Sequence, residues 1–420
     1  MKIKLTLSVL LLTFFQTVLL AQNTTNSPYS LYGYGELVDP SYGAQRAMGG
    51  IGYGLREANI INPLNPASYS RVDSMTFMLD LAITGQLSWL NDEINKEKRS
   101  NARLNYVAIQ FPLAKNLGMG LGFKPISQVG YKFGEAYTDS TISYSGSGGL
   151  NQFYGALSYS FKSLSVGVNA GYLFGKIYHL GSVTVSGSDP HYVMKADTLS
   201  TSGLVLDLGI QYTQLLKNNQ KIVLGLVYTP KLSVNGNFSG SVFSYNSSGV
   251  IQSDSAFSRK GGGYEMPETY AVGFSYAKGS KFLGGIDYTY QKWSDAQFGG
   301  EINQFNNRSK INIGGEFTPN VRSRNYFSRV HYRLGGNYAN SYISPAVRSN
   351  PNQQNELKEY SVSCGLGLPL IDRRSALNLS FEYAKVTPNQ RVIGLIDEQY
   401  LRFTVSYTFN ELWFYQRKVQ

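Results

Sequence analysis

The chain has 420 residues, of which only 15% are charged and 14% are aromatic, and it contains 44 glycines and 32 tyrosines. A soluble enzyme of this size would carry nearer ~25% charged residues, and the mean hydropathy of −0.21 is too low for a bundle of membrane-spanning helices. The formal net charge is +11, but the basic residues form no long tract, so we expect no nucleic-acid partner. Cys364 is the single cysteine, which excludes internal disulfides and thiolate metal clusters.

Residues 1–21 have the pattern of a secretory signal peptide. Lys2 and Lys4 form a basic start, residues 5–20 are apolar, and cleavage is expected after Ala21. A transmembrane anchor is the alternative, but the apolar stretch is short and no basic flank follows it. No other long apolar run is present, so we expect an exported chain that is periplasmic, secreted or inserted as a barrel.

Residues 22–74 lack the alternation of a strand and are rich in Gly, Pro and Asn. A short helix is expected near residues 41–60. A segment of this length can pack inside a closed barrel, so we expect it to form a periplasmic or luminal hatch that plugs the barrel.

From residue 75 onward, apolar and polar residues alternate. Between Leu401 and Phe409 every second residue is apolar, whereas Arg402, Thr404 and Ser406 lie between them. Lipid outside a barrel and water inside it require this pattern. We therefore predict an all-β fold, a transmembrane antiparallel barrel over residues 75–409, and a periplasmic tail over residues 410–420. About fourteen strands are expected, near residues 75–89, 103–113, 117–131, 149–161, 164–180, 202–216, 221–236, 267–277, 282–293, 308–318, 326–340, 360–368, 377–383 and 401–409.

The connections between these segments alternate in length, which is typical of outer-membrane barrels rather than of a soluble β-sandwich. An even number of strands places both termini on the periplasmic, short-turn side. Trp89 and Trp293 fall at the outer ends of predicted strands, where amphipathic rings favour the membrane interface. Long, flexible loops are expected on the outer side, near residues 90–102, 132–148, 181–201, 237–266, 294–307, 341–359 and 388–396.

The phase of the alternation directs several charged side chains into the lumen. On the later strands, residues of opposite sign are expected to pair in a luminal charge network that braces the wall or the hatch: Glu316, Arg333, Glu382 and Arg402. Apolar inward positions are few, so an apolar lining would have to come from the loops and from the hatch residues Leu55, Ile60, Ile61 and Leu64. The residues show no catalytic or metal-ligating constellation, and we expect neither enzyme activity nor a cofactor or metal.

Three stretches resemble the FadL/TodX-type outer-membrane transport protein family. The run AMGGIGYGLREANIINPLNPASYS, with Asn65, Pro66 and Ala67, is similar to the hatch motif of that family. Residues 266–298 resemble a pair of its strands, and residues 118–133 resemble its interrupted third strand. The resemblance implies a fourteen-stranded barrel that transports hydrophobic compounds such as long-chain fatty acids or aromatic hydrocarbons.

In that family the ligand leaves sideways through a gap where the third strand is interrupted. The matching place here contains Lys124, Pro125 and Gly130. Pro125 lacks a ladder N–H and would disrupt strand pairing, and Gly130 would deepen the interruption. The alternative is the upper end of an ordinary strand.

Two functions remain open. The first is uptake of hydrophobic small molecules by lateral exit through the wall, which the hatch and Pro125 favour. The second is a non-transporting barrel that acts as a subunit or shuttle of an outer-membrane secretion or assembly machine, which the charged lumen favours. The expected partners are outer-membrane lipid and lipopolysaccharide, with a hydrophobic ligand in the first case and an envelope protein complex in the second.

Overall fold

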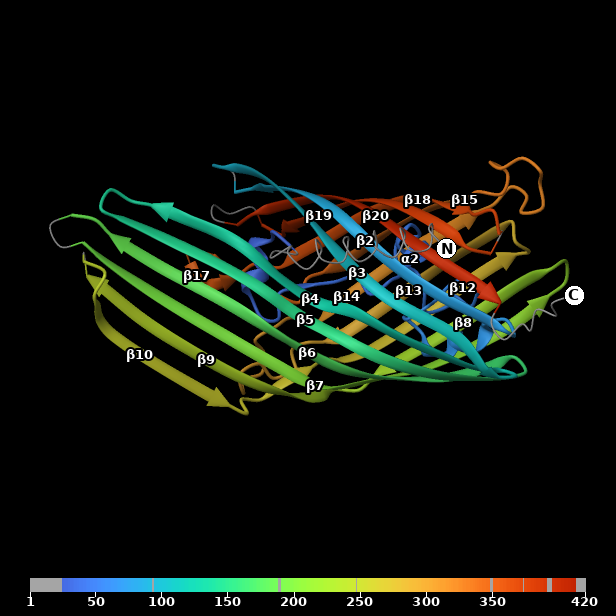
Figure 1. The fold of residues 1–420 in the computed structure, drawn as a ribbon, viewed down its shortest axis with the longest axis horizontal. Helices are drawn as coiled ribbons and strands as arrows, with labels where there is room; N and C mark the ends of the chain where they lie inside the picture. Colours follow the sequence, from blue (N-terminus) through green and yellow to red (C-terminus); the bar gives the residue numbers. More distant parts are fainter. Residues whose placement is uncertain are drawn as a thin grey trace, which may run out of the picture.

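The structure is a computed structural model that describes residues 25–412, except 93, 188–189, 247, 348–349, 373 and 391–394. Fourteen strands form a closed antiparallel barrel, as predicted (Figure 1). The last strand pairs with the first from Asn91 to Thr76, which closes the barrel. The barrel strands are β2 (Thr76–Asn91), β3 (Lys96–Ala114), β4 (Leu117–Ala136), β5 (Ser140–Phe161), β6 (Leu164–Val185), β7 (His191–Leu216), β8 (Gln220–Thr229), β12 (Glu268–Lys278), β13 (Phe282–Lys292), β14 (Arg308–Phe317), β15 (His331–Asn340), β18 (Leu357–Pro369), β19 (Ala376–Pro388) and β20 (Asp397–Leu412).

The exterior of the barrel is apolar. Large side chains such as Leu204, Ile313 and Val362 are 71%, 59% and 62% exposed, and Cys364 is also exposed. In a closed barrel all the backbone groups of paired strands are satisfied, so an apolar exterior suits lipid. The chain is therefore a membrane-spanning barrel of the outer-membrane type. None of the helices in the described part of the chain is long and apolar enough to span a membrane.

At one end of the barrel most connections are tight. Asn218 and Asn219 have φ values of +59° and +57°, which suits a turn whose twist matches that of the flanking strands. The connection before β15 is longer than expected, because β15 begins at His331 rather than near residue 326.

At the opposite end, which we call the outer end, the strands β4 to β7 run well past the barrel. β7 has 26 residues, whereas ~9–11 residues are enough to cross a membrane. Together with β9 (Leu232–Asn246) and β10 (Ile251–Lys260), these extensions form a sheet that we call the blade, at the left of Figure 1. Short strands β11 (Tyr264–Met266), β16 (Ala346–Val347) and β17 (Asn350–Gln354) complete this end.

The flexible loops predicted at 132–148, 181–201 and 237–266 are therefore wrong for most of their length. Their Ser, Gly and Asn residues lie in paired strands that have left the hydrocarbon core of the membrane, so their outward side chains need not be apolar. The connection predicted over 90–102 is also mostly strand, because β2 and β3 extend into it.

Residues 25–75, which we call the hatch, lie inside the lumen as far as Ser70, and the residues from Arg71 to Met75 are mostly exposed (Figure 1). They contain η1 (Pro28–Leu31), β1 (Glu36–Leu37), α2 (Gly43–Arg46) and η2 (Pro66–Arg71). The helix expected near residues 41–60 is thus only the short α2. The predicted signal peptide and residues 413–420 of the predicted tail lie outside the described residues, and β20 continues past the expected end of the barrel at residue 409.

Candidate functional site

The wall of the barrel opens between β3 and β4. β4 pairs with β3 only from Leu117 to Phe123, although it continues to pair with β5 as far as Ala136. Beyond Phe123 the freed edge of β4 pairs with β1 of the hatch, at Ser127 and Gln128. The backbone N–H of Val38 also donates to the carbonyl of Ile126, at 2.9 Å. The hatch therefore occupies the edge that β3 leaves.

Two bulges at the same level separate the strands. In β4 the register shifts between Pro125 and Ser127, so that Ile126 is an extra residue. In β3 the register against β2 shifts at Asn105, which is also extra. Each bulge bends its own strand and interrupts regular pairing. Gly130 does not contribute to this bend, because it lies in the regular β4–β5 ladder opposite Ser147.

Gly130 has a different role, since it admits the hatch. A Cβ atom at Gly130 would lie 2.1 Å from the carbonyl oxygen of Thr25. The N-terminal part of the hatch therefore packs directly on the backbone of β4, beside the opening.

The Asn-Pro-Ala motif seats the hatch on β6 and β7. The side-chain oxygen of Asn65 accepts a hydrogen bond from the N–H of Ala67 at 3.0 Å, which caps η2. Its amide nitrogen donates to the carbonyls of Tyr53 at 2.9 Å and Ile210 at 3.3 Å. Pro66 lies against two wall glycines, Gly167 and Gly209, where any side chain would collide with it.

These glycines belong to a larger set, the glycine girdle, which faces the hatch from strands around most of the barrel. At each member a Cβ atom would lie within 2.7 Å of a hatch atom, and at six of the nine glycines that atom belongs to the hatch backbone, so the wall and the hatch approach closely. Asp287 of β13 adds hydrogen bonds from the N–H groups of Gly52 at 2.5 Å and Tyr53 at 2.9 Å. The girdle consists of Gly118, Gly120, Gly167, Gly209, Gly225, Gly273, Gly314, Gly335 and Gly365.

The four charged residues of the predicted network form two separate clusters. In the first, Arg333 donates to Glu316 at 2.7 Å and to Asn378 at 2.6 Å, and His331 contacts the other oxygen of Glu316 at 2.7 Å. The side chains of this cluster therefore link three strands of the wall, β14, β15 and β19.

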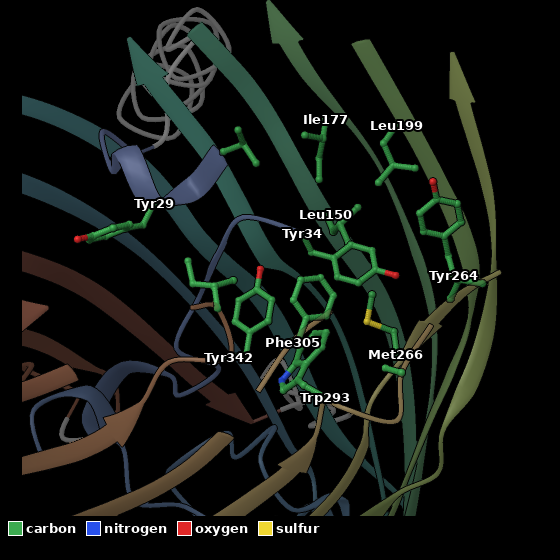
Figure 2. Packing of buried hydrophobic residues seen from close by; sticks show 14 of the residues in the cluster. Tyr29, Tyr34, Leu150, Ile177, Leu199, Tyr264, Met266, Trp293, Phe305 and Tyr342 are labelled. Carbon is green, nitrogen blue, oxygen red and sulfur yellow. The ribbon is translucent and has the colours of Figure 1, made fainter. Parts of the chain in front are cut away.

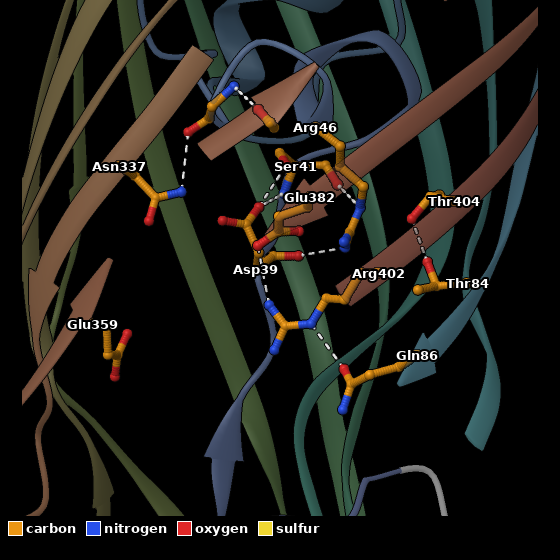
Figure 3. A network of polar contacts seen from close by, with 12 residues as sticks. Asp39, Ser41, Arg46, Thr84, Gln86, Asn337, Glu359, Glu382, Arg402 and Thr404 are labelled. Carbon is orange, nitrogen blue, oxygen red and sulfur yellow. Dashed lines mark hydrogen bonds and ion pairs between the residues drawn. The ribbon is translucent and has the colours of Figure 1, made fainter. Parts of the chain in front are cut away.

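In the second cluster Arg402 is the hub (Figure 3). It donates to Glu382 at 3.0 Å, to Gln86 at 2.8 Å and to Glu36 of β1 at 3.1 Å. All three charged side chains are largely buried. Arg402 therefore ties the hatch strand that lines the opening to the opposite side of the β3–β4 gap, through β20 and β2.

A further ion pair, which the sequence analysis did not identify, joins Asp39 of the hatch to Lys310 of β14. Burial disfavours the ionised form of Asp39, but the Lys310 ammonium and the Arg46 guanidinium outweigh it and hold the pKa of Asp39 below its ordinary value of 3.8. The alternation along the strand is enough to predict that the Lys310 side chain points into the lumen. Its pairing with Asp39 cannot be predicted in this way, because the position of Asp39 depends on how the hatch folds.

A large apolar cluster lies in the outer half of the lumen, which corrects the expectation of few inward apolar positions (Figure 2). Trp293 is 2% exposed and packs on Tyr342 with ring centroids 4.6 Å apart, so its predicted place at the lipid interface is wrong. The chain turns inward where β13 ends at Lys292. From the hatch, Tyr29 and Tyr34 join this apolar cluster, whereas Leu55 and Ile61 pack elsewhere, in smaller clusters.

A cavity of about 320 Å³ connects the apolar cluster with the opening. Its walls include Trp293, Tyr342 and Leu150 from the cluster, and Pro125 and Ile126 from the bulge. Its volume is at the small end of the range for ligand pockets. The charged residues Arg402, Lys310 and Asp39 line the other side, so the cavity is amphipathic.

Lys124 lines this cavity beside the opening. Its side chain is buried, with the residue 7% exposed, and its ammonium lies 5.5 Å from the centre of the Tyr154 ring. Among the residues that the structure describes, no carboxylate lies within ion-pair distance of Lys124. The Asp207 carboxylate interacts with this ammonium only from beyond ion-pair distance, so the buried charge is incompletely compensated.

Several proteins with solved structures have a fold similar to that of this chain. The toluene transporter TodX of P. putida is 16% identical, with a TM-score of 0.63 over 90% of this chain and 99% of that one. A Pseudomonas aeruginosa FadL homologue is 12% identical, with a TM-score of 0.61 over 89% and 99%. The CymD monoaromatic hydrocarbon channel is 16% identical, with a TM-score of 0.59 over 88% and 97%. These are channels rather than enzymes, and the predicted likeness to the FadL/TodX type is confirmed for the fold.

No curated protein matches the sequence. A family model described as BamG, however, matches residues 1–420. The chain thus has the fold of a FadL-type barrel, whereas its sequence matches the model of another family over its full length. The chain belongs to the BamG family.

Proposed function

We propose that this barrel takes up a hydrophobic small molecule from outside the cell and releases it sideways through the gap between β3 and β4. The single observation that carries the proposal is the cavity, which extends from an apolar cluster in the outer half of the lumen to a bulged, incompletely paired part of the wall. The likeness of the fold to TodX, a toluene transporter, and to CymD, a hydrocarbon channel, supports this proposal.

The glycine girdle also supports lateral release. A ligand that continued toward the short-turn end would have to dislodge the hatch from backbone contacts around most of the barrel. Release through the wall needs only the departure of β1, which pairs with β4 at two residues.

Lys124 favours an amphiphile with an anionic head over a pure hydrocarbon. A carboxylate beside Lys124 would compensate the buried ammonium, while an acyl chain or ring would lie against Leu150 and Trp293. A fatty acid combines both properties, and toluene has only the second.

The second candidate is a non-transporting subunit of an envelope complex, and the family match favours it. The full-length match is to BamG and not to the transporters, whose sequences are only 12–16% identical. In this case the apolar cluster and charge clusters would serve stability, and the blade or the wall opening would contact a partner.

Gentle extraction from native membranes, followed by mass spectrometry, separates the two functions. Under the uptake proposal the purified barrel carries a bound acyl chain or other hydrophobic molecule without a stoichiometric protein. A stoichiometric protein partner together with an empty cavity would overturn it in favour of the complex.

An uptake assay tests the route itself, with labelled oleate as the probe. Removal of Ile126 together with Pro125→Val eliminates the β4 bulge and restores a ladder donor, so uptake by expressing cells should fall toward the background. Heat-modifiable migration on gels checks that the variant barrel is folded. Unchanged uptake by a folded variant would contradict lateral release.

A further inference from the structure

A second hollow lies on the lipid-facing side of the wall, at the base of the blade. It is a shallow, open hollow of about 520 Å³ that crosses β6, β7, β9 and the end of β10. Apart from Phe174 and three glycines, its lining residues carry hydroxyl, amide or ammonium groups, although most of the surface that they present to the hollow is apolar, and no acidic residue contributes to it. We call it the outer groove, and its lining residues are Phe174, Gly175, Lys176, Ser200, Thr201, Ser202, Asn235, Gly236, Asn237, Lys260 and Gly261.

The position of the outer groove relative to the membrane follows from β6. Its outward side chains from Leu164 to Phe174 are Leu, Val, Val, Ala, Tyr and Phe, a stretch of 11 residues. A tilted transmembrane strand needs ~9–11 residues to cross the hydrocarbon core. Lys176 is the next outward residue, so it lies at the level of the lipid head groups on the outer side.

An aromatic layer lies directly beneath this level. Phe174 stacks on Phe153 with ring centroids 5.5 Å apart and lies 6.1 Å from Tyr172. Aromatic rings gather at the membrane interface, so the layer marks the same boundary independently of the residue count. The groove above it therefore faces head groups rather than acyl chains or bulk water.

The strand register places two lysines in one row. Lys176 pairs with Ser200, Ser200 pairs with Asn237, and Asn237 pairs with Lys260. Adjacent strands are ~4.8 Å apart, so the backbones of the two lysines are separated by roughly 14 Å. A hydroxyl and an amide lie between them on the same face.

Both lysines are exposed, and neither forms an ion pair with a residue that the structure describes. Each ammonium stands at the end of a flexible four-carbon side chain, so the two lysines can reach the two ends of an extended head group that lies between them. A disaccharide-sized head group that carries a phosphate at each end fits the row, because the serine and asparagine between the lysines can hydrogen-bond sugar hydroxyls.

We propose that the outer groove binds the head group of a phosphorylated glycolipid of the outer leaflet, with one phosphate at Lys176 and the other at Lys260. The acyl chains of that lipid pack on the aromatic layer below. The proposal goes beyond uptake through the lumen and does not depend on it, since the groove lies on the outside of the wall.

Reconstitution of the full-length purified barrel tests the proposal. The barrel is placed in phosphatidylcholine vesicles that contain either bis-phosphorylated lipid A or the same lipid after removal of its phosphates, and the lipid retained on the re-extracted protein is measured by mass spectrometry. The wild-type barrel should retain the phosphorylated form preferentially. Lys176→Gln with Lys260→Gln should reduce that retention about tenfold or more.

The matched control is Lys217→Gln with Lys278→Gln, which removes two exposed lysines at the short-turn end and leaves the net charge of the two double variants equal. This control should retain lipid A as the wild type does. Equal retention by both double variants, or equal retention of the two lipid forms by the wild type, would overturn the proposal. Oleate uptake should be unchanged in the groove variant, so its outcome is distinguishable from a failure of the proposed function.

Discussion

The glycine girdle gives the sharpest test of how the hatch is held, and Gly225→Ala is the most informative change. The new Cβ atom would lie 1.8 Å from the carbonyl oxygen of Tyr53, whereas ordinary contact begins near 3.4 Å, so Tyr53 must retreat by about 1.6 Å. That carbonyl accepts hydrogen bonds from Asn65 at 2.9 Å and Gln211 at 3.0 Å. Their loss costs about 1 kcal/mol each, and overpacking adds about 1–3 kcal/mol.

The total of about 3–5 kcal/mol corresponds to an increase of about two to nearly four orders of magnitude in the population of unseated hatch. Hydrogen exchange of the amides near Tyr53 should accelerate accordingly in Gly225→Ala. Gly85→Ala is the matched control, because nothing lies within 4 Å of a Cβ atom at that barrel glycine. Gel migration verifies a folded barrel in both variants. Wild-type exchange around Tyr53 in a folded Gly225→Ala variant would refute the argument that the girdle seats the hatch.

Three further predictions concern the charged groups. Arg402→Gln leaves two largely buried carboxylates without their cation and should destabilise the barrel by about 3 kcal/mol in denaturant unfolding, whereas Arg71→Gln, which breaks an exposed pair at 3.5 Å, should have almost no effect. The pKa of Asp39 is lower in the folded protein than in an unfolded chain, so its pair with Lys310 stabilises the hatch above about pH 4 and loses this contribution as the pH falls further. Hydrogen exchange of the hatch amides should therefore show a loss of protection at low pH beyond the intrinsic effect of pH on exchange. Asp39→Asn should abolish this extra pH dependence. Lys124→Met should weaken oleate binding about tenfold or more while leaving toluene binding within a factor of two, and equal losses for both ligands would contradict a head-group role.

The barrel was predictable because lipid imposes a strict alternation on each crossing strand. β7 shows where this signal ends. The sequence predicts that this strand begins at residue 202. At this level the outward side chains change from apolar Leu204 to polar Ser202 and Ser200, because the strand leaves the hydrocarbon core of the membrane here. Beyond that level the outward side chains no longer face the acyl chains of the lipid, so the alternation weakens, and the strand from His191 onward was interpreted as a loop.

The wall opening was only half predictable. Pro125 marks the β4 bulge in the sequence because proline lacks an N–H, but Asn105 at the matching bulge keeps its backbone N–H and marks no interruption of the ladder. Arg402 was assigned to the lumen by phase, together with Glu382. Its bond to Glu36 was not predictable, because it depends on the path of a hatch that has no periodic pattern.

The attachments of the hatch are unequal, and this inequality bears on both candidate functions. The girdle involves backbone contacts on strands from β4 to β18, so the hatch can leave it only by breaking many contacts together. β1 is held by two paired residues, by the bond from Val38 to Ile126 and by the ion pair of Glu36 with Arg402. Local opening begins where the fewest contacts must break. The release of β1 would uncover the edge of β4, as a departing ligand requires and as a partner strand that extended the wall would also require. The edge of β4 beside the cavity is therefore the part of the barrel that should move under either function.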